Sequence, residues 1–154
     1  MLYYEDLKPF PFDSGDAAEK FRAVGWLDRE HPYNRGEIDS DIARKLGQLL
    51  RDPWQPAESP GFAPCELCRL SKGPFEITFS DMTIKVGTRR IYVPGEGVIY
   101  VAPSMILHFI DAHEYCPPSA FQDAVRRCGE MRSMAYFKQL IKNAPKGFVS
   151  MAKG

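Results

Sequence analysis

Cys65 and Cys68 form a C-x-x-C pair in the segment PCELC, within a chain that has four cysteines in all. In a reducing compartment, such a pair is typically half of a metal site or a redox-active dithiol. A zinc site requires further thiolate or imidazole ligands. The span LHFIDAHEYC supplies them as His108 and His113, with Cys116 as a rival for the fourth position. The sequence therefore predicts a zinc site formed by Cys65, Cys68, His108 and His113.

The spacing of the two histidines sets a geometric condition on this site. His108 and His113 are five residues apart, which corresponds to about 140° around an ideal helix. Both imidazoles are expected to face one ion only if the helix ends or distorts before His113. Pro117 and Pro118 favour an early end, because proline does not continue a helix. Four protein ligands close the coordination sphere, so the predicted role of the zinc is structural.

Two enzymatic uses of the pair are less well supported by its surroundings. A thioredoxin-like redox motif places C-x-x-C at the start of a helix, which lowers the pKa of the first thiol. Here a proline-rich loop precedes the pair, and RLSKGPF, which does not favour a helix, follows it. A zinc deaminase needs H-x-E upstream of P-C-x-x-C. The upstream histidine is His31, and Tyr33 stands where the glutamate is required.

A purely structural interpretation of these side chains stays open at this point. A histidine on an apolar helix is commonly a hydrogen-bonded core residue, and Ser104 and Asp111 lie within about one turn of His108. Cys128 falls on the apolar face of a predicted helix that also carries Phe121, so we expect a buried small hydrophobe there.

The elements around these residues predict an α+β fold, with a small antiparallel β-meander packed against three or four helices in a single domain, 1–154. Residues 38–52 have apolar side chains at helical spacing. Residues 75–101 contain four short runs rich in β-branched and aromatic residues, separated by turn signals. Residues 103–144 are the predicted helical C-terminal part, and Ser104 is the expected cap of its first helix.

Residues 1–36 are expected to be an irregular segment with short extended pieces. The segment carries many aromatic side chains, among them Phe10, Phe21 and Trp26. These side chains either fasten the segment to the body of the protein or form an exposed contact surface.

Composition limits the classes of function. The chain has 154 residues, of which 44% are hydrophobic, and this suits one domain with a single core. Twenty basic and twenty acidic side chains cancel, so no summed field draws the protein to nucleic acid or to an anionic membrane. No segment reaches the roughly 18 apolar residues of a spanning helix. We expect a cytoplasmic protein with neither nucleic acid nor membrane as partner.

Three parts of the chain together resemble an uncharacterised family of small bacterial proteins. They are YYEDLKPF, GFAPCELC and VIYVAPSMILHFIDAHEYCPPSAFQDAV. The family pattern is a Y-x-D-L start, then G-[FY]-x-x-C-x-x-C, then Y-x-A-P-x-x-I-x-H-[YF]-x-x-x-H-x-Y-x-P-P-x-x-F. The resemblance covers residues 3–126 and marks, by position, Cys65, Cys68, His108 and His113. It implies no activity, and it does not ask for cysteine at position 116.

Two classes of function are carried forward. The first is a small, zinc-stabilised, non-enzymatic bacterial protein that binds another protein, as an immunity or adaptor protein does. Small size, neutral charge and the lack of a complete catalytic motif favour it. The alternative is a metal-dependent hydrolase or deaminase-like enzyme, with three protein ligands and a water on the zinc and with Glu66, Asp111 or Glu114 as acid/base. The coordination sphere distinguishes the two classes.

Overall fold

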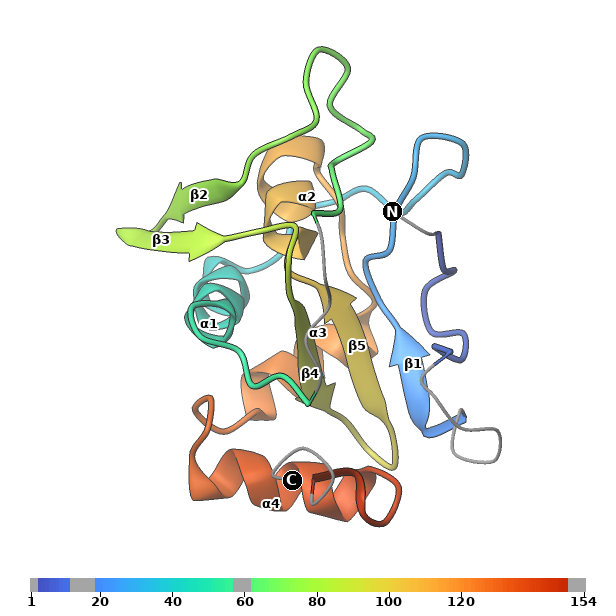
Figure 1. The fold of residues 1–154 in the computed structure, drawn as a ribbon, viewed down its shortest axis with the longest axis vertical. Helices are drawn as coiled ribbons and strands as arrows, with labels where there is room; N and C mark the ends of the chain where they lie inside the picture. The colour runs from blue at the N-terminus through green and yellow to red at the C-terminus, as the bar shows by residue number, and fades with distance from the viewer. Residues whose placement is uncertain (1–2, 12–18, 57–61, 150–154) are drawn as a thin grey trace.

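The computed structural model describes residues 3–11, 19–56 and 62–149, and the fold is drawn in Figure 1. Gly61 of the expected family pattern, and residues 1–2 and 12–18 of the N-terminal segment, lie outside this part. The described residues form five strands and four helices, which confirms the α+β class. In chain order they are β1 (Phe21–Ala23), α1 (Ser40–Leu50), β2 (Glu76–Phe79), β3 (Met82–Lys85), β4 (Arg90–Pro94), β5 (Ile99–Pro103), α2 (Ile106–His113), α3 (Ser119–Arg127) and α4 (Met134–Asn143).

The strands belong to two separate sheets. β4 and β5 form an antiparallel hairpin, and β1 pairs in parallel with the other side of β5, giving the order β1-β5-β4. β2 and β3 form a two-stranded hairpin of their own, which projects to one side in Figure 1. The four strands expected within 75–101 are present, but they do not form one continuous meander. The chain turns between β3 and β4 at Gly87, whose φ of 92° is rarely adopted by residues other than glycine.

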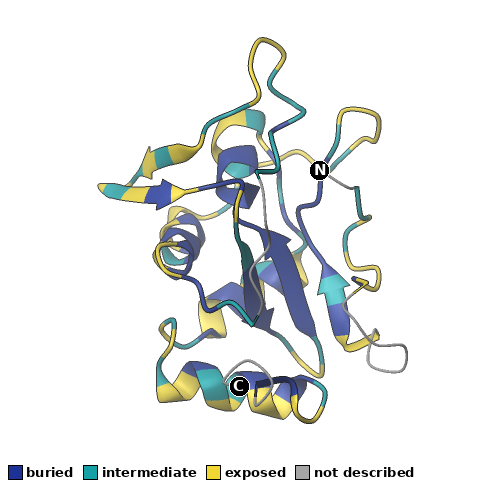
Figure 2. Ribbon diagram, in the orientation of Figure 1, coloured by how far each residue is buried: buried dark blue, intermediate teal, exposed yellow. Residues whose placement is uncertain are grey.

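Two of the four helices pack against the three-stranded sheet, and the buried apolar residues form one hydrophobic core. α3 and α4 pack against β4, while α1 packs against β3, α2 and α3. Every residue of β5 is buried, as the dark blue strand in Figure 2 shows. A strand buried on both faces has no need for alternating polarity, and IYVAP has none. The core therefore extends to both faces of β5, and the first turn of α2, with Ile106, Leu107 and Phe109, is buried in it as well.

The N-terminal aromatic residues belong to this core. Phe10 and Phe21 are each 2% exposed and Trp26 is 7% exposed, so the interpretation of these three side chains as an exposed contact surface is wrong. The indole Nε1 of Trp26 donates a 2.8 Å hydrogen bond to the carbonyl of Val101 in β5. Burial of large aromatic side chains fastens the segment, because each removes much apolar surface from water.

Ser104 has a different role from the expected helix cap. α2 starts two residues later, after Met105, and no side chain caps it. The Ser104 side chain is fully buried, and its Oγ accepts hydrogen bonds from the backbone N–H groups of Gly87 at 3.0 Å and Arg89 at 3.3 Å. The hydroxyl thus satisfies backbone groups of the turn between the two sheets.

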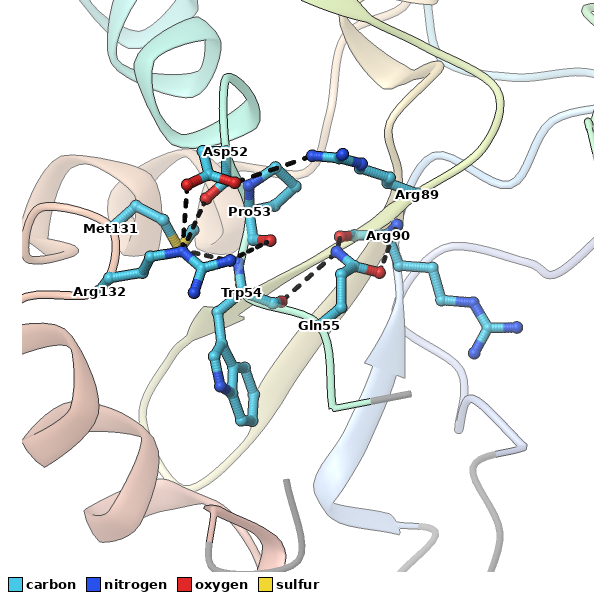
Figure 3. A network of polar contacts seen from close by, with 8 residues as sticks. All are labelled: Asp52, Pro53, Trp54, Gln55, Arg89, Arg90, Met131 and Arg132. Carbon is cyan, nitrogen blue, oxygen red and sulfur yellow. Dashed lines mark hydrogen bonds and ion pairs between the residues drawn. The ribbon is translucent and has the colours of Figure 1, made fainter. Parts of the chain in front are cut away.

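The chain that leaves α1 is held by two polar side chains, shown in Figure 3. Arg132 Nε donates to the carbonyl of Asp52 at 3.3 Å and pairs with the Asp52 carboxylate at 3.4 Å. The amide of Gln55 bonds both backbone groups of Arg90, much as a neighbouring strand would. These contacts fix residues 52–55 along the start of β4.

Candidate metal centre

Cys65 and Cys68 lie in a tight turn of the loop that precedes β2, the green loop at the top of Figure 1. The backbone N–H groups of Leu67 and Cys68 donate hydrogen bonds to Cys65 Sγ. The Cys65 N–H donates to the carbonyl of Lys72 at 2.8 Å and closes the loop. We call residues 65–73 the cysteine turn.

Gly73 is required at the end of the cysteine turn. Its φ is 85°, in the left-handed region, and a Cβ on it would lie 2.6 Å from the Cβ of Cys65. Any side chain at this position would displace Cys65 and distort the turn. Sequence inspection did not single out Gly73, because its role depends on the folded path of the loop.

The two histidines come from α2. His108 lies in its first turn and His113 is its last residue, followed by Glu114 in the left-handed conformation with φ 58°. The helix was expected to end or distort before His113; instead it ends at His113, with the left-handed residue directly after it. An imidazole reaches well beyond the helix surface, and Cys68 Sγ lies 3.3 Å from Nε2 of His108 and 3.5 Å from Nε2 of His113. Both rings thus converge on one point beside the helix.

The four side chains form one compact group. Cys65 Sγ lies 3.5 Å from Nε2 of His113, and one ligand atom from each of Cys65, Cys68, His108 and His113 lies within 4.8 Å of all the others. The halves of the group are 40 residues apart in sequence, since Cys68 contacts His108. The predicted proximity of the C-x-x-C pair to this helix is observed.

The distances suit a tetrahedral zinc ion. Zn–S bonds of about 2.3 Å and Zn–N bonds of about 2.05 Å, set at the tetrahedral angle, separate a sulfur from a nitrogen by about 3.6 Å. The three sulfur–nitrogen distances here are 3.3, 3.5 and 3.5 Å. Two thiolates and two imidazoles also form a ligand set that suits zinc, whereas calcium and magnesium prefer oxygen ligands. These residues could hold a metal ion without rearrangement of the backbone.

Burial sets the protonation states of the group. It raises the pKa of Cys65 to about 11, although hydrogen bonds from the N–H groups of Leu67 and Cys68 oppose the rise. Burial, followed by the nearby His113, lowers the pKa of His108. Burial and then the charge of Arg35 lower the pKa of His113. Neutral imidazoles offer free lone pairs, whereas metal binding has to displace the thiol protons.

The other candidate residues lie apart from this group. Cys116 Sγ contacts the Pro117 carbonyl at 3.8 Å and Gln122 Nε2 at 3.7 Å, so the rival fourth ligand is not in the cluster. His31 bonds the Asp28 carboxylate at 2.7 Å. Ser104 is engaged with backbone N–H groups, which leaves it unsuited as the polar partner proposed for His108.

Cys128 ends α3 and is 4% exposed, as expected of a small core hydrophobe. Burial raises the pKa of its thiol to about 11, which keeps the side chain protonated and unreactive at neutral pH.

A groove of about 790 Å³ opens beside the group, between the loop 28–35 and the cysteine turn. His113 forms part of its wall, together with Tyr33, whose hydroxyl donates a 2.9 Å hydrogen bond to the His113 carbonyl. Arg29 Nε donates to the carbonyl of Glu66 at 2.9 Å and ties the two loops together. No sequence motif predicts this groove, because it forms where two irregular segments meet in the fold.

The comparisons with known proteins give a family and no activity. Residues 2–126 match the model of a family described as a domain of unknown function (DUF7919), and the chain belongs to that family. The match includes the cysteine turn and all of α2. Neither the curated proteins nor the solved structures yielded a match. Among the described residues, no helix has the length and apolar character needed to cross a membrane.

Proposed function

We propose that Cys65, Cys68, His108 and His113 bind a structural zinc ion, and that the protein is a non-enzymatic module that binds another protein. The observation that carries the metal part is the convergence of four ligand atoms within 4.8 Å from two segments of the chain. Four protein ligands fill a tetrahedral sphere, which leaves no position for a catalytic water. The ion then fastens the cysteine turn to α2.

The protein-binding part is supported by the surface around the zinc site. The cysteine turn and the loop 28–35 border an open groove lined by polar and charged side chains. Two of the three carboxylates suggested as acid/base in an enzyme are less favourable for that role, while Glu66 is half-buried. Asp111 and Glu114 are exposed to solvent, and Glu114 pairs with Arg35 at 3.6 Å.

Elemental analysis of the purified protein tests the metal directly. We expect about one zinc ion per chain in the wild type, and loss of most of it in Cys65→Ser. Cys116→Ser is the matched control, because it removes a thiol that lies outside the cluster. Absence of stoichiometric metal from the wild type, or equal loss in the control, contradicts the proposal.

A metal-dependent hydrolase or deaminase-like enzyme is the second candidate. One observation favours it: His113 lies in the wall of the groove, so a ligand in the groove can approach the metal position. The enzyme would need three protein ligands and a water.

The absorption spectrum of the cobalt-substituted protein separates the two functions. A sphere closed by four protein ligands predicts a tetrahedral cobalt spectrum that azide and thiocyanate leave unchanged. An open position predicts a clear spectral change on addition of either anion, and that result would replace the structural role with a catalytic one. His113→Ala, which creates an open position, is the positive control for anion binding.

A further inference from the structure

The groove beside the zinc site has an unusual share of arginine side chains. Arg29 and Arg35 come from one side, and Arg69 comes from the cysteine turn on the other. Its volume of about 790 Å³ is far above the roughly 30 Å³ that one water molecule occupies. A groove of this size suits several residues of a peptide better than a single ion.

Much of the hydrogen-bonding capacity of these arginines is unused. Arg69 is exposed and has no hydrogen bond or ion pair with another described residue. Arg35 pairs with Glu114 at 3.6 Å, but both side chains are mostly exposed, so this contact is weak. Arg29 uses its Nε for the Glu66 carbonyl, which leaves its two terminal NH₂ groups.

The acidic residues of the groove do not cancel the positive charge of the three arginines. Oδ1 of Asp28 accepts a hydrogen bond from the backbone N–H of His31 at 3.0 Å and contacts its ring Nδ1 at 2.7 Å, so this oxygen is already engaged. Glu30 is the other carboxylate of the lining, and it is exposed to solvent. The lining holds three arginines and two carboxylates, so its formal charge is positive by one. Arginine is the side chain best suited to bidentate contact with a carboxylate.

An apolar contact lies directly next to this charge. Leu70 follows Arg69 in the cysteine turn, and this residue is fully exposed. Leu67, in the same turn, is half-buried and forms part of the groove lining. A partner side chain that covers Leu70 would gain the free energy of removing this apolar surface from water.

We propose that the groove binds an acidic peptide segment of a partner protein, whose carboxylates pair with Arg35 and Arg69 and whose apolar side chain covers Leu70. This inference rests on the proposed protein-binding function and names the chemistry of the partner. Arg69 is the residue after Cys68, so the ion that fixes the cysteine turn also fixes the position of this guanidinium. Metal removal is therefore expected to weaken peptide binding.

The probe is a fluorescein-labelled octapeptide of alternating glutamate and leucine, titrated with the zinc-loaded full chain by fluorescence anisotropy. We expect saturable binding, and we expect Arg35→Ala/Arg69→Ala to raise the Kd at least about tenfold, since each charge-assisted hydrogen bond contributes about 1.5 to 3 kcal/mol. Arg127→Ala is the matched control, because Arg127 is also exposed and paired at 3.2 Å with Glu96, away from this groove.

The outcomes are distinct for the two proposals, because zinc content is measured on the same samples. Zinc-loaded protein that does not bind the peptide, or a double variant that binds as tightly as the wild type, overturns this inference and leaves the metal proposal intact. Equal binding of an octapeptide of alternating lysine and leucine also overturns it. Displacement of the peptide by inorganic phosphate at lower concentration than by unlabelled peptide identifies a small-anion site instead.

Discussion

Removal of the metal should lower the stability of the folded protein by an amount that follows from the topology. The proposed ion would join Cys68 to His108, which are 40 residues apart. A cross-link that closes a loop of n residues removes about 2.1 + 1.5R ln n cal/mol/K of entropy from the unfolded chain, which is about 4 kcal/mol for this loop at 25 °C. For a chain of this size, that corresponds to a fall in Tm of about 8 to 16 °C.

Urea unfolding and calorimetry, with and without a zinc chelator, measure this loss under reducing conditions. Chelation changes no side chain, so the loss reports the metal alone. Cys68→Ser should reproduce it in the presence of zinc, because Cys68 is only half-buried and its replacement adds little packing cost. Cys116→Ser should stay within about 0.5 kcal/mol of the wild type.

The metal-free protein is nevertheless expected to stay folded. Its core includes the buried strands β4 and β5, and Cys65 is the one proposed ligand in the core cluster, so the core is built mainly from other residues, unlike that of an isolated zinc finger. A chelator that leaves Tm unchanged would refute the assignment of the four residues as a metal-binding cross-link. Complete unfolding on chelation would refute the view that the core stands independently.

Three further predictions concern single residues. Gly73→Ala should reduce zinc content and cost more stability than Gly97→Ala, because both glycines have positive φ but only the first would bring a Cβ within 2.6 Å of Cys65; equal effects in elemental analysis and unfolding would contradict the role of Gly73. Burial raises the pKa of Asp6 in the folded protein above its ordinary value of 3.8. The unfolded chain therefore loses this proton first as pH rises, so the contribution of Asp6 to stability should fall through a window that starts near 3.8. In urea titrations, the stability of Asp6→Asn relative to wild type should increase across that window. Ser104→Ala should cost about 1 to 3 kcal/mol in unfolding experiments, because it leaves two backbone N–H groups without their acceptor, and a neutral result would show that the turn rearranges.

The candidate site was more predictable than the tertiary fold around it. The C-x-x-C spacing and the two histidines, His108 and His113, in one helix identify the ligand types. Which atoms can bind zinc depends on the residue types and not on the tertiary contacts between the two segments. What sequence could not supply was the path of the chain. The helix was expected to end or distort before His113, whereas it ends at His113 and both imidazoles still reach Cys68 Sγ.

Elements that depend on distant partners were harder to predict. β1 is only three residues long, and it exists as a strand because Phe21 pairs across from Ile99 of β5. A segment of that length has no periodicity of its own. The division of residues 75–101 into two sheets likewise depends on the turn at Gly87, which its sequence neighbours do not reveal.

The same parallel pairing bears on how the chain reaches its native state during synthesis. Trp26 finds its hydrogen-bond acceptor 75 residues further along, and the hydroxyl of Tyr115 reaches Asp6 across 109 residues. At 5 to 20 residues per second, the ribosome needs roughly 4 to 15 s to deliver residue 101 after residue 26. The N-terminal segment leaves the ribosome first but reaches its native contacts late, because β1 and Trp26 pair with β5. Its aromatic side chains stay accessible to chaperones until β5 has left the ribosome.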